Sequence, residues 1–179
     1  MHKKVLIIST SPRRGGNSDS LADAFAQGAR EAGHTVEQIS LSDKTIGFCK
    51  GCLVCQKTQR CVIRDDADSI AQNMLTADVL VFSTPIYYYG MCGQMKTMLD
   101  RSNPLYAADY RFRDVYLLAA AAEEDEQTVD GAVNGLQGWI DCFEKARLAG
   151  TVFAGGVTAV GDIENHPALQ RAHQLGNAV

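Results

Sequence analysis

The amino-acid sequence predicts a single α/β domain, residues 1–179, built on a five-stranded parallel sheet with strand order 2-1-3-4-5. Two apolar runs, Val5–Ile8 and Val79–Phe82, have the length and the β-branched residues of central strands that are buried on both faces. Segments with apolar residues at helical spacing alternate with strand-like runs, and this alternation is typical of a doubly wound parallel sheet. A length of 179 residues fits one domain and favours five strands over the six of a dinucleotide-binding domain.

The first half of the chain supplies the outer second strand and two helices. Asn17 or Ser18 can cap the first turn of the first helix, and Gly33 is expected to end it. A second strand is expected in residues 34–41, where apolar residues recur between polar ones. Asp65-Asp66 then caps the next helix, which leads into the strand at the centre of the chain.

The second half continues the same alternation. After the third strand, the expected elements are a helix at 91–101, a strand at 115–122, a long helix beginning at Glu123, a strand at 151–154 and a short helix beginning at Pro167. The long helix carries apolar residues at core spacing, so Trp139 and Phe143 are expected in the core rather than at a ligand.

Composition and charge limit the partners of the protein. Hydrophobic residues make up 46% of the chain, and the formal net charge of -4 leaves no basic surface for nucleic acid or an anionic membrane. The first apolar run is too short for a signal peptide, and no stretch reaches membrane-spanning length. We therefore expect a cytoplasmic protein without nucleic-acid or membrane partners.

The stretch Ser9–Ser18 joins the first strand to the first helix and is rich in hydroxyl and glycine residues. Backbone N–H groups of such a loop converge at the positive end of a helix, which favours an anion. The sequence contains neither the lysine-containing loop of nucleoside triphosphatases nor the Gly-x-Gly-x-x-Gly fingerprint. Hydroxyl and amide donors suit a terminal monophosphate, and an ordinary strand-to-helix turn with good capping residues is the alternative.

The predicted strand order places strands one and three side by side where the winding direction reverses. The loops Ser9–Ser18 and Thr84–Gly90 then face the same crevice, where ligands of such sheets bind. The second loop contributes a proline, an isoleucine and the three tyrosines Tyr87–Tyr89. A flat, mostly apolar ring system attached to a monophosphate fits both loops, and flavin mononucleotide (FMN) is such a molecule.

Three segments together resemble the NAD(P)H-dependent FMN reductases: Ser9–Ser18, Thr84–Gly90, and the helix segment from Lys96 to Asp100-Arg101. The resemblance implies a flavodoxin-like three-layer sandwich. It implies FMN phosphate contacts from Ser9, Ser11, Arg13, Asn17 and Ser18. It also implies ring contacts, largely through backbone groups, from Pro85, Ile86, Tyr87, Tyr88, Tyr89 and Gly90. A third ring-facing loop is expected near residues 121–124, and we assign no contacts in it.

Members of this family carry out their chemistry on the flavin, which accepts a hydride from NADH or NADPH and passes electrons to a second acceptor. The resemblance therefore implies an enzyme that uses FMN and NAD(P)H with a small acceptor such as a quinone, a free flavin or a nitro compound. No side chain is assigned as an acid–base catalyst, and Lys96, Asp100 and Arg101 are expected to be structural. A homodimer or homotetramer is implied as well, because relatives wall the flavin with a neighbouring chain.

Four of the six cysteines lie in a long connection, residues 42–63, at Cys49, Cys52, Cys55 and Cys61. Their spacing, C-x2-C-x2-C-x5-C, is similar to that of bacterial ferredoxins and can supply four thiolates to a [4Fe-4S] cluster. Zinc can use the same thiolates, and free or redox-active thiols are a third interpretation. The two remaining cysteines, Cys92 and Cys142, are expected to be buried and inert.

The cysteine segment, together with Asp65-Asp66, also resembles an iron–sulfur subset of the same family. Two functions therefore stay open beside the NAD(P)H-dependent FMN oxidoreductase. One is an iron–sulfur flavoprotein that carries electrons from a ferredoxin through a [4Fe-4S] cluster to FMN. The other is a flavodoxin-type electron carrier without catalytic activity. The iron and sulfide content of the protein distinguishes the iron–sulfur flavoprotein from the other two. NAD(P)H oxidation slower than that by free FMN favours the electron carrier.

Overall fold

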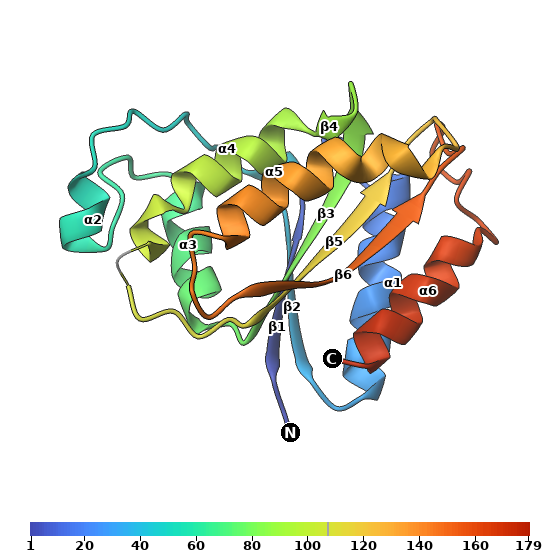
Figure 1. Cartoon of the computed structure of the whole chain (residues 1–179), viewed down its shortest axis with the longest axis horizontal. Coiled ribbons are helices and arrows are strands. Elements are labelled where there is room, and N and C mark those ends of the chain that lie inside the picture. Colours follow the sequence, from blue (N-terminus) through green and yellow to red (C-terminus); the bar gives the residue numbers. More distant parts are fainter. Residues whose placement is uncertain (107) are drawn as a thin grey trace.

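The computed structural model describes residues 1–106 and 108–179 as a three-layer α/β sandwich (Figure 1). Five parallel strands form the central sheet: β1 (Lys4–Ser9), β2 (Thr35–Ser40), β3 (Val79–Tyr87), β5 (Asp114–Ala120) and β6 (Arg147–Ala154). Their order, β2-β1-β3-β5-β6, confirms the predicted order 2-1-3-4-5. The sheet also contains a sixth strand that the sequence does not predict, since β4 (Gly90–Met91) pairs antiparallel with the end of β3.

Helices cover both faces of the sheet, with α1 and α6 on one face and α3, α4 and α5 on the other (Figure 1). The helices are α1 (Asn17–Glu31), α2 (Val54–Thr58), α3 (Asp66–Thr76), α4 (Gly93–Arg101), α5 (Asp130–Ile140) and α6 (Pro167–Asn177), with short 3-10 helices η1 (Leu41–Asp43), η2 (Asn103–Leu105) and η3 (Glu126–Val129). Side chains of β1 alternate between the two layers: Leu6 and Ile8 join the core on the α3 side, and Val5 and Ile7 join the core on the α1 side. All four are completely buried, as expected for a strand covered on both faces.

The two helices of the first layer approach closely because each presents a glycine to the other. A Cβ at Gly28 of α1 would lie 2.0 Å from the backbone oxygen of His173, and a Cβ at Gly176 of α6 would lie 2.1 Å from that of Phe25. Any side chain at either glycine would force the helices apart. This contact holds α6, and with it the chain that connects β6 to α6, against α1.

Several sequence-based expectations about local structure are confirmed. Gly33 follows α1 with φ +88°, the left-handed conformation that ends many helices. The Asp65 side chain caps α3, and Pro167 occupies the first position of α6. Trp139 packs against the core on the α5 side, and its indole N–H donates a hydrogen bond to Ser102 Oγ at 2.9 Å. In the described part of the chain, no helix is both long and apolar enough to cross a membrane.

Two helix starts differ from the predicted ones. Gly16 is the N-cap of α1, and neither Asn17 nor Ser18 caps it with a side chain. The acidic run from Glu123 does not begin the long helix, because the backbone there accepts a hydrogen bond from the segment after β6. The chain forms η3 next, and α5 begins only at Asp130.

A buried ion pair fixes the long connection between β2 and α3. The Arg101 guanidinium at the end of α4 is 0% exposed and makes two hydrogen bonds of 2.7 Å to the two carboxylate oxygens of Asp65. It also donates to the backbone oxygens of Gly47, at 2.7 Å, and Ile63, at 3.2 Å. Burial alone would raise the pKa of Asp65, but hydrogen bonds from Arg101 and Gly47 N–H and the charge of Arg101 outweigh it and lower that pKa. One arginine therefore ties both ends of the cysteine-bearing segment to α4, the structural role expected for it.

The buried pair predicts a large loss of stability on Arg101→Met. Removing the guanidinium leaves the largely buried Asp65 carboxylate without its cationic partner and two backbone oxygens without their donor, and such a loss costs about 3–5 kcal/mol. Lys96→Met on the same helix is the control, because Lys96 pairs with Asp100 across one exposed turn at 2.6 Å and such pairs contribute about 0.5 kcal/mol. Urea denaturation of both variants measures the difference. Equal losses of stability would contradict the anchoring role of Arg101.

Candidate functional site

A trough runs along the carboxyl ends of β1, β3 and β5, where the winding of the sheet reverses. One part, the first-loop end, is lined by Ser11, Arg13, Gly16, Asn17, Ser18, Pro85, Ile86, Tyr87, Ala120, Ala121, Ala122, Val157, Thr158 and Val160. The other part, the hairpin end, is lined by Ile86, Tyr87, Tyr88, Tyr89, Ala121, Ala122, Glu123 and Thr128. The two parts share four residues and form one hollow. The structure thus brings together the predicted cofactor-binding residues, except Ser9 and Gly90.

The loop between β1 and α1 forms the floor of the first-loop end. Ser11 Oγ accepts a hydrogen bond from Arg13 N at 3.1 Å and lies 2.9 Å from Arg13 O, to which it donates. Gly15 takes φ +65°, a left-handed conformation suited to glycine, and turns the chain into α1. No side chain caps α1, so the N–H groups of its first turn are available to an anion.

Ser9 stabilises this loop from its buried side. Its hydroxyl donates a hydrogen bond to the Asp19 carboxylate, and the other oxygen of that carboxylate accepts from Gly15 N at 2.8 Å. Ser9 is buried and does not line the trough. The hydroxyl predicted to contact a phosphate therefore holds the loop in place through Asp19.

A second wall of the first-loop end comes from the segment 155–163, between β6 and α6. Asn17 Nδ2 donates to the backbone oxygen of Ala159 at 2.9 Å, and Arg13 donates through Nη1 to that of Thr158 at 3.0 Å. Asp162 fastens the segment by accepting from Thr158 N and Ala159 N at 2.9 and 2.7 Å, and these two donors lower the pKa of its carboxyl. Asn17 is thus a crosslink between the two walls, which explains why its side chain is not a helix cap.

Buried hydroxyl groups connect the first loop to the end of β3. Thr10 Oγ1 donates to the Ser83 backbone oxygen at 2.9 Å, and Ser83 Oγ donates to the Ser18 backbone oxygen at 2.6 Å. Thr84 Oγ1 accepts from Cys92 N at 3.2 Å, and the Cys92 thiol lies against Thr10. Cys92 is buried, as predicted. These contacts fix the spacing between the first-loop end and the hairpin.

The β3–β4 hairpin forms the rim of the hairpin end. Its strands pair Tyr87 with Gly90, so Tyr88 and Tyr89 form a two-residue turn. Both turn residues have positive φ, 49° and 61°, as in the type I′ turns of two-residue hairpins, which favour asparagine and glycine. Bulky residues rarely adopt this conformation. Tyr88 is fully exposed, and the turn projects from the molecule at β4 (Figure 1).

The family model described as NADPH-dependent FMN reductase matches residues 3–163. The chain belongs to this family. Its fold agrees, because the chain superimposes on an azoreductase from Bacillus anthracis with a TM-score of 0.74, at 19% identity over 99% of this chain and 100% of that one. The matched range includes every residue that lines the trough, from the first loop to the segment after β6.

Two relatives illustrate the range of the family. The chain is 31% identical to YwqN of Bacillus subtilis, named as an NAD(P)H-dependent FMN-containing oxidoreductase, over 96% of each chain. It is 40% identical over 102 residues to an iron-sulfur flavoprotein from Methanocaldococcus jannaschii, a match of 57% of this chain and 53% of that protein. The chain therefore spans about half the length of the curated iron-sulfur flavoproteins that it matches.

Sequence reasoning missed two parts of the trough wall. Val157, Thr158 and Val160 follow the last strand of the sheet, which the strand order separates from β1 by two other strands. The pair Gly155-Gly156 directly after an apolar strand is the only local signal of a loop at this edge. Thr128 lies in η3, where the sequence predicts the interior of a long helix, so no signal pointed to it.

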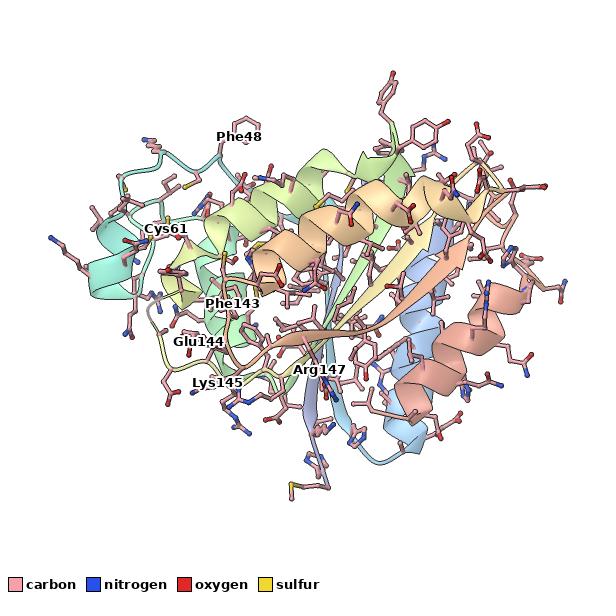
Figure 2. The ribbon with its side chains drawn as sticks, viewed as in Figure 1. Phe48, Cys61, Phe143, Glu144, Lys145 and Arg147 are labelled. Atoms are coloured by element: carbon pink, nitrogen blue, oxygen red, sulfur yellow. The ribbon has the colours of Figure 1, made fainter. Side chains whose placement is uncertain are left out.

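The cysteine segment lies away from the trough. Cys61 is near α2 and the C-terminal end of α4, whereas the hairpin is near the opposite end of that helix (Figures 1 and 2). Cys49 and Cys52 are exposed, while Cys55 is buried and its sulfur accepts a hydrogen bond from Asn103 Nδ2 at 3.1 Å. In the part of the chain that the structure describes, no three His, Cys, Asp or Glu side chains are grouped to hold a metal ion. Cys142 is exposed, contrary to the prediction that it is buried.

These exposures predict the order in which the thiols react. In the reduced, metal-free protein, a thiol-specific reagent should modify Cys49, Cys52 and Cys142 rapidly, because all three are exposed. Cys55 and Cys92 should react only when the protein unfolds. Peptide mass mapping after short labelling identifies the modified residues, and urea-unfolded protein is the control. Labelling of Cys55 as fast as that of Cys49 would contradict the described arrangement.

Proposed function

We propose that the protein binds FMN in the trough and is an NAD(P)H-dependent FMN oxidoreductase that passes reducing equivalents to a small acceptor such as a quinone, a flavin or a nitro compound. The observation that carries this proposal is the trough itself. It joins an uncapped helix N-terminus to an apolar rim at the switch point of the sheet. Membership of the NADPH-dependent FMN reductase family supports the same conclusion.

The first-loop end fits a phosphate. The first turn of α1 offers backbone N–H groups, and Ser11, Arg13 and Ser18 line the same end of the trough. Helix N-termini and arginine are common partners of phosphate oxygens. We assign the FMN phosphate to this end, with Asn17 and Ser9 holding the surrounding loops.

The hairpin end fits a flat ring. Ile86 and Tyr87 line this end together with Ala121 and Ala122, so its walls are mostly apolar. A few polar groups remain available. Thr128 Oγ1 is buried without a hydrogen-bond partner among the described residues, and its residue lines this end at 3% exposure. Apolar walls with a few placed polar groups are typical of cofactor sites.

The bound flavin would supply the chemistry, accepting a hydride and passing its electrons to the acceptor. The chain contributes binding and orientation. The hydroxyl network between Thr10 and Ser83 sets the distance between the two ends of the trough, and the apolar wall that includes Ile86 would limit the access of water to a bound ring. We assign no catalytic side chain.

Reconstitution of the purified protein with FMN tests the proposal. Protein reconstituted with FMN should show a visible flavin spectrum and oxidise NADH or NADPH in the presence of a quinone, free flavin or nitro compound faster than free FMN does. Oxidation no faster than that of free FMN would contradict the enzyme and favour a flavodoxin-type carrier. Failure to bind FMN would contradict the site.

The same sample tests a second candidate, an iron–sulfur flavoprotein that receives electrons from a ferredoxin. Six relatives named iron-sulfur flavoprotein, at 34–40% identity, favour it. The positions of the four thiols oppose it, since they would have to regroup around a cluster. After anaerobic purification, less than about one iron per chain would exclude a [4Fe-4S] cluster.

The proposal includes a homodimer or homotetramer in which a second copy covers the exposed hairpin. The side chains of Tyr87, Tyr88 and Tyr89 are all exposed beside the trough, and neighbouring large aromatic side chains of this kind are enriched at interfaces. Light scattering coupled to size-exclusion chromatography measures the mass. A monomer would contradict this part of the proposal.

Asn17 provides a test of the first-loop end. Asn17→Leu removes the crosslink to Ala159 and puts an apolar side chain beside the phosphate, so the FMN dissociation constant should rise about tenfold or more while the fold persists. Asn73→Leu is the control, because Asn73 bonds Glu37 outside the trough. Fluorescence titration of FMN measures both constants. Full FMN affinity in Asn17→Leu would contradict the assignment.

A further inference from the structure

The turn at Tyr88 and Tyr89 has a backbone that its residues do not favour. Both have positive φ, and neither is a glycine or an asparagine. A strained backbone of this kind persists only where the surrounding structure enforces it, and such residues cluster at functional sites. The turn belongs to the rim of the trough, so the contact that holds it also sets the shape of the hairpin end.

That contact comes from α5. A Cβ at Gly131 would lie 2.1 Å from the backbone oxygen of Tyr89 and 3.2 Å from its carbonyl carbon, so no side chain fits at this position. One turn later, a Cβ at Gly135 would lie 2.9 Å from Cε of Met91, the second residue of β4. One face of α5 therefore packs against the turn at Gly131 and against β4 at Gly135.

Glycine is an unfavourable residue inside a helix, because it loses more backbone freedom than alanine when the helix forms. Packing explains Gly131 and Gly135, but Gly138, two turns beyond Gly131, has no atom within 4 Å of its Cβ position. The three glycines of α5 thus differ in their surroundings. Gly131 faces backbone, Gly135 faces the flexible end of a side chain, and Gly138 faces open space.

We propose that Gly131 is a positioning residue for the cofactor: its missing side chain lets α5 hold the strained Tyr88–Tyr89 turn in the conformation that forms the hairpin end of the trough. The inference rests on the proposed function, since the cofactor in question is FMN. Thr128, in the turn before α5, lines the same end. Displacement of the hairpin from α5 therefore separates the two walls of the hairpin end and weakens binding of the ring.

Alanine substitutions along this helix test the proposal as a graded series. Gly131→Ala should raise the FMN dissociation constant at least tenfold and speed amide hydrogen exchange in residues 86–91. Gly135→Ala should have a smaller effect, because the end of the Met91 side chain can move aside. Gly138→Ala is the matched control, with the same gain in helix propensity and no new contact, and should stay within twofold of the unsubstituted protein. Circular dichroism verifies the fold of each variant.

The outcomes separate this inference from the proposed function. If the unsubstituted protein does not bind FMN, the proposed function fails, and faster exchange of the hairpin in Gly131→Ala than in Gly138→Ala would still support the contact. If it binds FMN and Gly131→Ala keeps the same affinity and exchange rates, the positioning role alone is overturned. Should Gly131→Ala not fold, Gly135→Val crowds the same hairpin through Met91, and unchanged FMN affinity in that variant overturns the proposal.

Discussion

The parallel pairing of β1 with β3 is the constraint on which the rest of the structure depends. The two strands lie side by side in the sheet, but the chain leaves β1 toward α1 on one face and leaves β3 toward α4 on the other. Their carboxyl ends therefore cannot be covered by either connection, and a hollow remains between them. The hydrogen bonds from Thr10 to Ser83 and from Ser83 to Ser18 hold the edges of this hollow at a fixed separation.

Each end of the trough is completed by an element distant in the sequence. The segment 155–163 closes the first-loop end, because close packing of α1 and α6 at Gly28 and Gly176 brings the chain after β6 beside Asn17. The hairpin end depends on α5 in the same way, through Gly131. In both places a glycine allows two elements to approach closely. The resulting packing holds the segment bonded to Asn17 at one end and the strained Tyr88–Tyr89 turn at the other.

The cysteine segment is organised separately from the trough. Its ends are tied to α4 by Arg101 and Asp65, and Asp68 accepts hydrogen bonds from Arg60 and from Cys61 N. Between these anchors, Phe48 is exposed (Figure 2), and so are two of the four thiols, Cys49 and Cys52. A thiol site built here would therefore form on a surface that the buried ion pair holds in place, without altering the sheet that positions the trough.

The sequence by itself determined the sheet order and the two loops that meet at the switch point, because buried parallel strands leave local patterns in the chain. The residue motifs of those loops also indicated the family. The sequence also marked Arg101 as structural. Only the tertiary structure decided that Ser9 acts through Asp19, that Asn17 links two walls, that Cys142 is exposed and that Thr128 lines the trough. These features depend on which distant groups lie nearby, and spacing along the chain carries no information on such neighbours.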